Sequence, residues 1–171
     1  MLLCVFFASC SGDMKDIERF ARQQNPPDQE IKEARVRRSE VGRLQMELEA
    51  PAICRYSKPD AVTIYPQGVD LRFYDEEGHL RTYLHANNAT TYDERHIMRA
   101  SDSAMVIDYT NGDTVYLEDI VWRQDDDVIF SNHPVRAVNG NRITLGDGFS
   151  SNANMTNLRI TRQRGVIEIN E

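Results

Sequence analysis

Apolar and polar residues alternate along most of the chain between Gly78 and Phe149. Leu80, Leu84 and Ala86, for example, fall on one side of a two-residue period. A half-buried strand requires this period, because successive side chains of a strand point to opposite faces. Helical periodicity does not alternate with these segments, so the pattern favours antiparallel strands over a parallel sheet.

Short polar turns separate the alternating segments. They are Glu77-Gly78, Asn111-Gly112-Asp113, Asp125-Asp126-Asp127 and Asn139-Gly140-Asn141. Asn-Gly between two alternating segments is a strong hairpin signal, since both central residues of a type I′ turn need positive φ. The sequence therefore predicts an all-β fold built as a series of antiparallel hairpins.

Two internal repeats indicate that one strand–turn module is used several times. Gly42, Leu44, Leu48, Ala50 and Tyr56 recur at the same spacing as Gly78, Leu80, Leu84, Ala86 and Tyr92. A weaker repeat relates Asn111, Gly112, Val115, Leu117 and Asp119 to Asn139, Gly140, Ile143, Leu145 and Asp147. Such hairpins must bury their apolar faces against each other, which predicts a sandwich, a roll or a barrel. Strict alternation also places Val115 and Leu117 on one face of their strand and Ile120 and Trp122 on the other face.

Length and composition narrow the possible functions. The chain has 171 residues, which suits one domain with a real core plus extensions. Its net charge of −7 argues against nonspecific nucleic-acid binding. No apolar run is long enough to span a bilayer as a helix. The cysteines Cys4, Cys10 and Cys54 fit neither a zinc site nor a disulfide framework.

The first residues resemble the end of a bacterial lipoprotein signal. Met1–Ser9 is apolar and uncharged, and Cys10 follows directly after Ala8 and a serine. Phe7 stands where leucine is commonest in such signals, and no basic residue precedes the apolar run. We expect the apolar run to be removed as a signal remnant and Cys10 to carry the lipid, which places the mature protein outside the cytoplasm.

The next residues predict a lead-in to the β domain. Apolar residues of Asp13–Gln24 have the spacing of a short amphipathic helix, and Asn25–Asp28 breaks it as a linker. Glu30–Glu40 is highly charged and is interpreted as solvated chain before the first strand, with contact to anionic head groups as the alternative. We therefore assign residues 10–38 to the lipid anchor, short helix and linker, and residues 39–171 to the β domain.

The sequence shows no catalytic constellation, so we expect no enzyme activity, cofactor or bound metal. His79, His85, His96 and His133 are scattered over turns and strands. A Ser-His-Asp triad drawn from such residues is a weak signal. The acidic runs Asp75-Glu76-Glu77 and Asp125-Asp126-Asp127 lack the spaced oxygen ligands of a calcium loop. Both are interpreted as turn acids.

An ordered set of short motifs accompanies this pattern. After the lipoprotein-like start come Tyr65-Pro66-Gln67-Gly68-Val69, Phe73-Tyr74-Asp75 with Gly78, Leu84 with Ala86, Ala89 with Tyr92, Asn111-Gly112-Asp113-Thr114, Trp122, and Gly146 with Gly148-Phe149. The set resembles the LptC family of lipopolysaccharide-export proteins, in the lipoprotein form found in Bacteroidetes-like bacteria. The resemblance covers residues 39–171.

The resemblance implies a twisted, open β-jellyroll of antiparallel strands, as in LptA and LptC. Such a protein binds the acyl chains of lipopolysaccharide inside the roll. It accepts the lipid from the inner-membrane LptB–LptF–LptG transporter and passes it to LptA towards the outer membrane. The expected location is the periplasm, with a lipid anchor at Cys10 in the inner membrane where many family members have a transmembrane helix.

Alternation and the resemblance together predict two functional regions. The lipid-binding groove is expected to draw on Leu71, Phe73, Leu84, Ala86, Met98, Val106, Leu117, Ile120, Trp122, Ile129 and Phe149. The partner edge, open to a strand of LptA, is expected at Leu158, Ile160, Val166, Ile167 and Ile169. The alternative is that this last segment pairs with an earlier strand and closes the roll.

Two other functions remain open at this point. An acidic, lipid-anchored β-sandwich is also typical of a carbohydrate-binding module, although Trp122 is the single tryptophan available for a flat aromatic face. A secreted jellyroll hydrolase would need clustered histidines or carboxylates on neighbouring strands, and the sequence predicts no such set.

Overall fold

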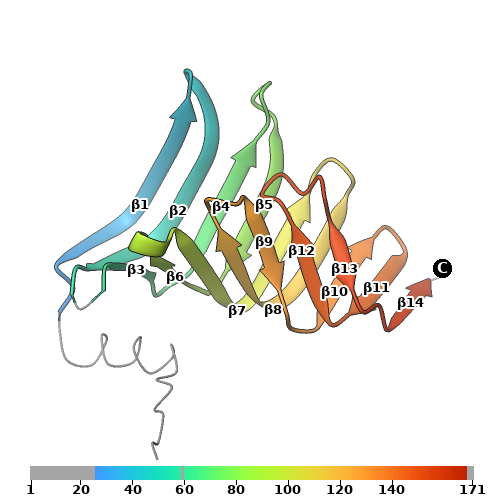
Figure 1. Ribbon diagram of the computed structural model, residues 1–171. Helices are drawn as coiled ribbons and strands as arrows, with labels where there is room; N and C mark the ends of the chain where they lie inside the picture. Colours follow the sequence, from blue (N-terminus) through green and yellow to red (C-terminus); the bar gives the residue numbers. More distant parts are fainter. Residues whose placement is uncertain (1–25, 59, 169–171) are drawn as a thin grey trace, which may run out of the picture.

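The structure is a computed structural model that describes residues 26–58 and 60–168. Fourteen strands form one continuous antiparallel sheet (Figure 1). They are β1 (Gln29–Glu40), β2 (Arg43–Tyr56), β3 (Val62–Tyr65), β4 (Val69–Tyr74), β5 (Leu80–Ala86), β6 (Asn88–Tyr92), β7 (Ile97–Asp108), β8 (Asp113–Arg123), β9 (Val128–Ser131), β10 (Val135–Asn139), β11 (Arg142–Gly146), β12 (Gly148–Ser151), β13 (Arg159–Thr161) and β14 (Gly165–Glu168), with a 3-10 helix at Asp93–Arg95. The predicted all-β fold and its hairpin turns are confirmed. The predicted helix in Asp13–Gln24 lies outside the described residues, as do Cys10 and Ile169.

The long strands run through two layers of the folded sheet. In β2, Met46–Glu49 pairs with β4, whereas Cys54–Tyr56 pairs with β3. In β7, Ile97–Ser101 pairs with β6, whereas Met105–Asp108 pairs with β5. Strand β8 divides in the same way between β10 and β9, and β1 follows β2 along its length. Each long strand therefore bends from one layer into the other.

We call the layers A and B. Layer A contains β4, β5, β10, β11 and β14, layer B contains β3, β6, β9, β12 and β13, and the long strands contribute one part to each. The crease is the side where the chain crosses between layers, for example at Asn87 between β5 and β6. The open side lies opposite, where hairpin turns such as Asp75–His79 join neighbouring strands of the same layer. The result is a jellyroll-like fold whose two layers are joined by the backbone along the crease and not along the open side.

Small side chains line the crease. Ala50, Ala86, Ala89, Ala100 and Ala104 lie at or beside the crossings, belong to the hydrophobic core, and are at most 4 % exposed. An alanine fills little space, so the backbones of the two layers approach closely on this side. Larger core side chains also lie beside the crease, such as Tyr65 at the β3–β4 crossing and Phe149 after the β11–β12 crossing, and Phe73 and Trp122 lie near the open side.

Two glycines mark the closest approach, where β11 passes into β12. A Cβ on Gly146 would lie 2.3 Å from Cγ2 of Ile160 and 2.9 Å from the carbonyl oxygen of Thr161. A Cβ on Gly148 would lie 2.4 Å from Oγ1 of Thr161. At both positions the absence of a side chain is what admits the neighbouring strand β13.

The crossings change which residues face inward. The register of β7 against β8 shifts between Ser101 and Ala104, and the two residues between them, Asp102 and Ser103, have positive φ values of 59° and 71°. On the opposite strand, Leu117 and Ile120 are both buried in the core. The strict alternation predicted through Val115–Trp122 is thus wrong at this point, because the strand changes layer and its phase shifts with it.

The β domain begins earlier than predicted. Strand β1 pairs with β2 from Gln29, so the boundary at Ser39 is wrong. Most β1 side chains are exposed and many are charged, although Ala34 is buried. A charged strand at the edge of a sheet shows little hydrophobic alternation, since few of its residues reach the core; in β1, Ala34 is buried and Ile31 packs against the core as a partly buried residue. The sequence pattern therefore resembled a solvated linker.

The first internal repeat corresponds to equivalent strands. Strands β2 and β5 both follow a hairpin glycine with positive φ and reach the crease at Ala50 and Ala86. The second repeat is only partly equivalent. Val115 and Leu117 belong to the core cluster, whereas of their counterparts Ile143 is buried outside that cluster and Leu145 is partly buried.

We predict that Gly146→Ala lowers the free energy of unfolding by about 1–3 kcal/mol, the usual cost of overpacking a tight site. Gly165→Ala is the matched control, because no described residue lies within 4 Å of its added Cβ and its φ is not positive. Chemical denaturation of both variants measures the difference. Equal stability of the two variants would show that the crease is not a close contact.

Candidate functional site

The interior between the layers contains every residue predicted for the groove. None of them is more than 6 % exposed, and all belong to one hydrophobic cluster. They are Leu71, Phe73, Leu84, Ala86, Met98, Val106, Leu117, Ile120, Trp122, Ile129 and Phe149. The same cluster includes core residues that the prediction left out, among them Ile53, Val69, Val115 and Met155. That this interior accepts lipid stays a prediction.

The apolar interior extends along the whole roll. Ala34 of β1 belongs to the cluster near the beginning of the described chain, and Phe149 of β12 belongs to it near the end. Leu158 and Ile160 pack against the same cluster as partly buried residues. The core is thus a continuous apolar layer that reaches from the first strand to β13.

An aromatic pair joins the layers near the open side. Phe73 of layer A and Trp122 of layer B meet edge to face, with ring centroids 5.3 Å apart and an interplanar angle of 88°. Each residue lies one position from the end of its strand, next to a hairpin turn. Such a pair contributes about 0.5–1.5 kcal/mol beyond its burial, far less than a hydrogen-bonded strand.

The predicted partner edge divides between two strands. Among the described strands, β14 pairs with β11 and β13 pairs with β12, and the two do not pair with each other. Val166 and Ile167 of β14 are 45 % and 51 % exposed, whereas Leu158 and Ile160 lie against the core. Strand β14 therefore pairs with β11 along one edge, and no described strand pairs with its other edge.

Charged residues cover the outer face of layer A at its other end. Arg72 lies 2.6 Å from Glu49, and Arg37 lies 2.5 Å from Glu47. Arg35 also pairs with Glu49. The hydrogen bonds from Arg72 and Arg35 lower the pKa of Glu49. These ladders tie β1, β2 and β4 together on the outer face, where Glu47 is only 8 % exposed beneath the arginines.

A carboxylate, a phenol and an imidazole meet on the outer face of β4 and β5. The Tyr83 hydroxyl donates to Asp70 at 2.5 Å, and His85 Nδ1 lies 2.8 Å from the same oxygen. Partial burial opposes ionisation of Asp70, but the hydrogen bonds from Tyr83 and His85 hold its pKa below the usual value. Burial and the bond to Asp70 raise the pKa of Tyr83 to about 12.

The crossing between β9 and β10 brings a serine, a histidine and an aspartate together. The Ser131 hydroxyl donates to Asp119 at 3.2 Å, and His133 Nε2 lies 3.8 Å from that carboxylate. Arg99 binds the other carboxylate oxygen at 3.0 Å. In a catalytic triad the serine bonds to the histidine, which activates it. Here the serine donates to the aspartate, an arrangement that supports the crease and does not prepare a nucleophile.

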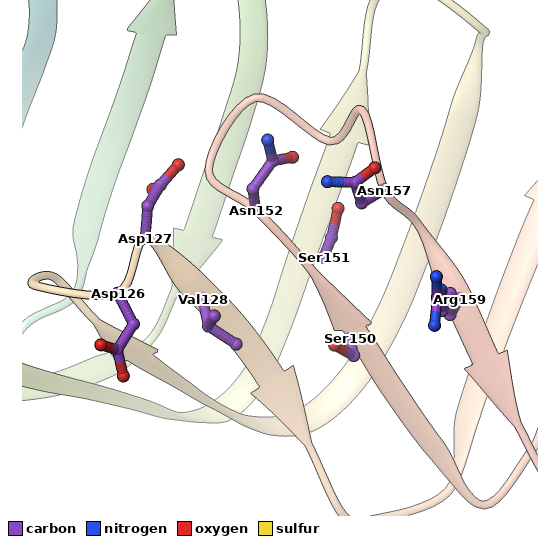
Figure 2. A pocket seen from close by; sticks show the side chains of 8 residues that line it. All are labelled: Asp126, Asp127, Val128, Ser150, Ser151, Asn152, Asn157 and Arg159. Atoms are coloured by element: carbon purple, nitrogen blue, oxygen red, sulfur yellow. The ribbon is translucent and has the colours of Figure 1, made fainter.

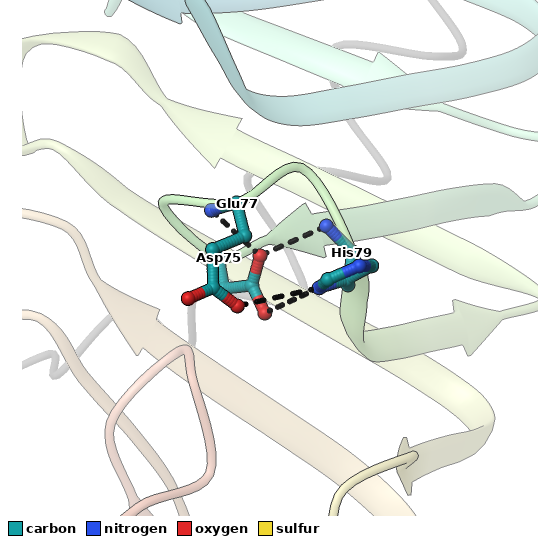
Figure 3. A group of neighbouring side chains, drawn as sticks. All are labelled: Asp75, Glu77 and His79. Atoms are coloured by element: carbon teal, nitrogen blue, oxygen red, sulfur yellow. Dashed lines mark hydrogen bonds and ion pairs between the residues drawn. The ribbon is translucent and has the colours of Figure 1, made fainter.

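Asp75, Glu77 and His79 gather at the turn between β4 and β5 (Figure 3). One oxygen of Asp75 accepts hydrogen bonds from the backbone N–H groups of Glu77 and His79, at 3.0 and 2.8 Å. The side chains of Glu77 and His79 are 80 % and 74 % exposed. The interpretation of Asp75 as a turn acid is confirmed.

A polar hollow of about 510 Å³ lies beside β9, β12 and β13 (Figure 2). Asp126, Asp127, Val128, Ser150, Ser151, Asn152, Asn157 and Arg159 line it. The carboxylates of Asp126 and Asp127 point in different directions, so they do not converge on one cation (Figure 2). Asp127 instead accepts a hydrogen bond from the backbone of Ala153. The hollow offers hydroxyl, amide and charged groups for polar ligands.

Thr82 is an interior residue that the predicted site omitted. It is 0 % exposed and lies opposite Phe73 in the register of β4 and β5. Its position on the alternating face of Leu80–Ala86 was the available signal. A polar side chain on that face was not counted as part of an apolar groove.

We predict that Tyr83 ionises near pH 12, well above the ordinary phenol value of about 10. A raised tyrosine pKa means that the protonated phenol stabilises the fold below about pH 10, and that this contribution is lost as the pH rises towards 12. A tyrosinate absorbance titration should show a smaller late phase in Tyr83→Phe, and Tyr65, whose pKa is also raised by burial, accounts for the remainder. Asp70→Asn should shift that phase to lower pH, and an unchanged late phase in both variants would contradict the assignment.

Comparison with known proteins leaves the family open. No helix within residues 26–58 and 60–168 is long and apolar enough to cross a membrane. No family model matches the sequence, and no curated protein matches it. The LptC resemblance therefore stays a prediction, and any functional assignment depends on the geometry of the roll.

Proposed function

We propose that this protein is a non-catalytic lipopolysaccharide carrier of the LptC type. It accepts acyl chains between layers A and B from the LptB–LptF–LptG transporter and passes them to LptA. The observation that carries the proposal is the continuous apolar core from Ala34 to Phe149, enclosed by two layers that are bonded along one side. The proposed anchor is a lipid on Cys10, in the periplasmic face of the inner membrane.

The arrangement of the layers supports entry of a chain from the open side. Backbone crossings hold the crease, whereas the hairpins on the open side stay within one layer. The layers can therefore spread there without breaking strand pairing. Burial of one methylene contributes about 0.8 kcal/mol relative to water, so the layers shield a chain of about twelve methylenes from a large cost of exposure in the periplasm. The Phe73–Trp122 contact that the chain displaces contributes about 0.5–1.5 kcal/mol.

The polar hollow favours a second candidate, a carbohydrate-binding module. Ser150, Asn152, Asn157 and the flanking charges are groups that hydrogen-bond sugar hydroxyls. Binding to lipopolysaccharide and to the same polysaccharide without lipid A separates the two functions. A lipid carrier retains only the first ligand, and a carbohydrate module retains both.

We predict that a photoreactive amino acid in place of Phe73 crosslinks to lipopolysaccharide in cells. The same substitution at Tyr83 is the control, since both positions are aromatic and lie on adjacent strands, but Phe73 faces the core and Tyr83 faces outward. Crosslinks only from Tyr83 would place the lipid on the outer face. No crosslink from either position would count against lipid transfer.

The exposed edge of β14 generates a prediction about LptA. Val166→Lys should weaken capture of LptA by about tenfold or more, the equivalent of about 1.4 kcal/mol, because a charge on an edge strand opposes strand addition. Val41→Lys is the matched control, as Val41 is 95 % exposed in the turn between β1 and β2. Titration calorimetry measures both. Equal affinities for the two variants would exclude this edge as the docking site.

A further inference from the structure

Polar atoms without partners remain in the apolar interior. Thr82 Oγ1, Trp122 Nε1 and Ser151 Oγ are buried and have no hydrogen-bond partner within residues 26–58 and 60–168. Native proteins satisfy most buried polar groups, because desolvation without a new bond costs free energy. Unpaired groups on the inner face of a core are therefore candidates for contact with a ligand.

The first two of these groups flank the same contact. Thr82 lies opposite Phe73 in the register of layer A. Trp122 of layer B meets the ring of Phe73 edge to face. Both groups thus lie near the open side, where the proposed function has the acyl chain enter.

The third group connects this place to the polar hollow. Ser151 lies opposite Ile129, and Ile129 lies opposite Trp122, so the three residues form one row across layer B. Ser151 also lines the hollow shown in Figure 2. The unpaired groups therefore follow a line from a polar surface site into the apolar interior.

The chemistry of these groups defines what they bind. The indole N–H of Trp122 only donates, and the hydroxyls of Thr82 and Ser151 both donate and accept. A hydrocarbon chain leaves all of them unpaired. A hydroxyl or carbonyl oxygen attached to the chain is an acceptor to which an indole N–H and a threonine hydroxyl can both donate.

We propose that Thr82 and Trp122 bind an oxygen substituent of the acyl chain, so that the interior selects hydroxylated or acyloxy-branched chains over plain ones. This inference rests on the proposed function and names its substrate class. The hollow beside Ser151 then faces the polar part of the same lipid molecule.

The test compares β-hydroxymyristate with myristate, two chains that differ by one hydroxyl, as competitors for lipopolysaccharide bound to the full chain. The wild-type protein should favour the hydroxylated chain by about fivefold, the equivalent of one net hydrogen bond. Thr82→Val should abolish the preference and raise the unfolding midpoint, because it removes an unpaired polar atom. Thr63→Val is the control, since the Thr63 hydroxyl already donates to Asp93 at 3.0 Å. It should lower the midpoint and keep the preference.

The outcomes separate this inference from the proposed function. Equal displacement of lipopolysaccharide by both chains would overturn the inference and leave lipid binding intact. A preference that persists in Thr82→Val would also overturn it. Failure of the wild-type protein to bind lipopolysaccharide at all would overturn the proposed function, and the inference with it.

Discussion

Close approach of the two layers along the crease is the constraint on which the rest of the structure depends. Alanines such as Ala86 and Ala100 and the side-chain-free Gly146 and Gly148 let the backbones meet there. Larger side chains complete the core beside this line and towards Phe73 and Trp122 near the open side. The interior is filled throughout, because protein interiors are packed to a nearly constant density.

The same geometry leaves the two ends of the roll unequal. Strand β1 is long and charged, and Arg35 and Arg37 pair with acids on β2. Charge of this kind protects a strand edge from unwanted pairing. Strand β14 is short and exposes Val166 and Ile167. A directional chain of rolls would need such a difference between its ends, and the proposed transfer to LptA makes use of it.

Much of the candidate interior was predictable, since the burial of β4, and of β5 from Thr82 onward, alternates and places Leu71, Phe73 and Leu84 inward. Thr82 was not assigned to the site, although it lies on the same face. A polar residue in an apolar row becomes a candidate binding residue only when the structure shows that its hydroxyl has no partner among the described residues. That fact depends on atoms from the facing layer, and no local pattern contains it.

The sequence by itself determined the all-β class, the hairpin turns at Gly78, Gly112 and Gly140, and the equivalence of β2 and β5, because these depend on local alternation and backbone conformation. Tertiary structure decided where strands change layer. The crossing in β8 turns both Leu117 and Ile120 inward, and β1 becomes a strand only through its pairing with β2. Alternation of apolar and polar residues distinguishes the two faces of a strand only while the strand stays flat. A strand that bends between layers exchanges those faces, and only contact with its neighbours fixes the residue at which it does so.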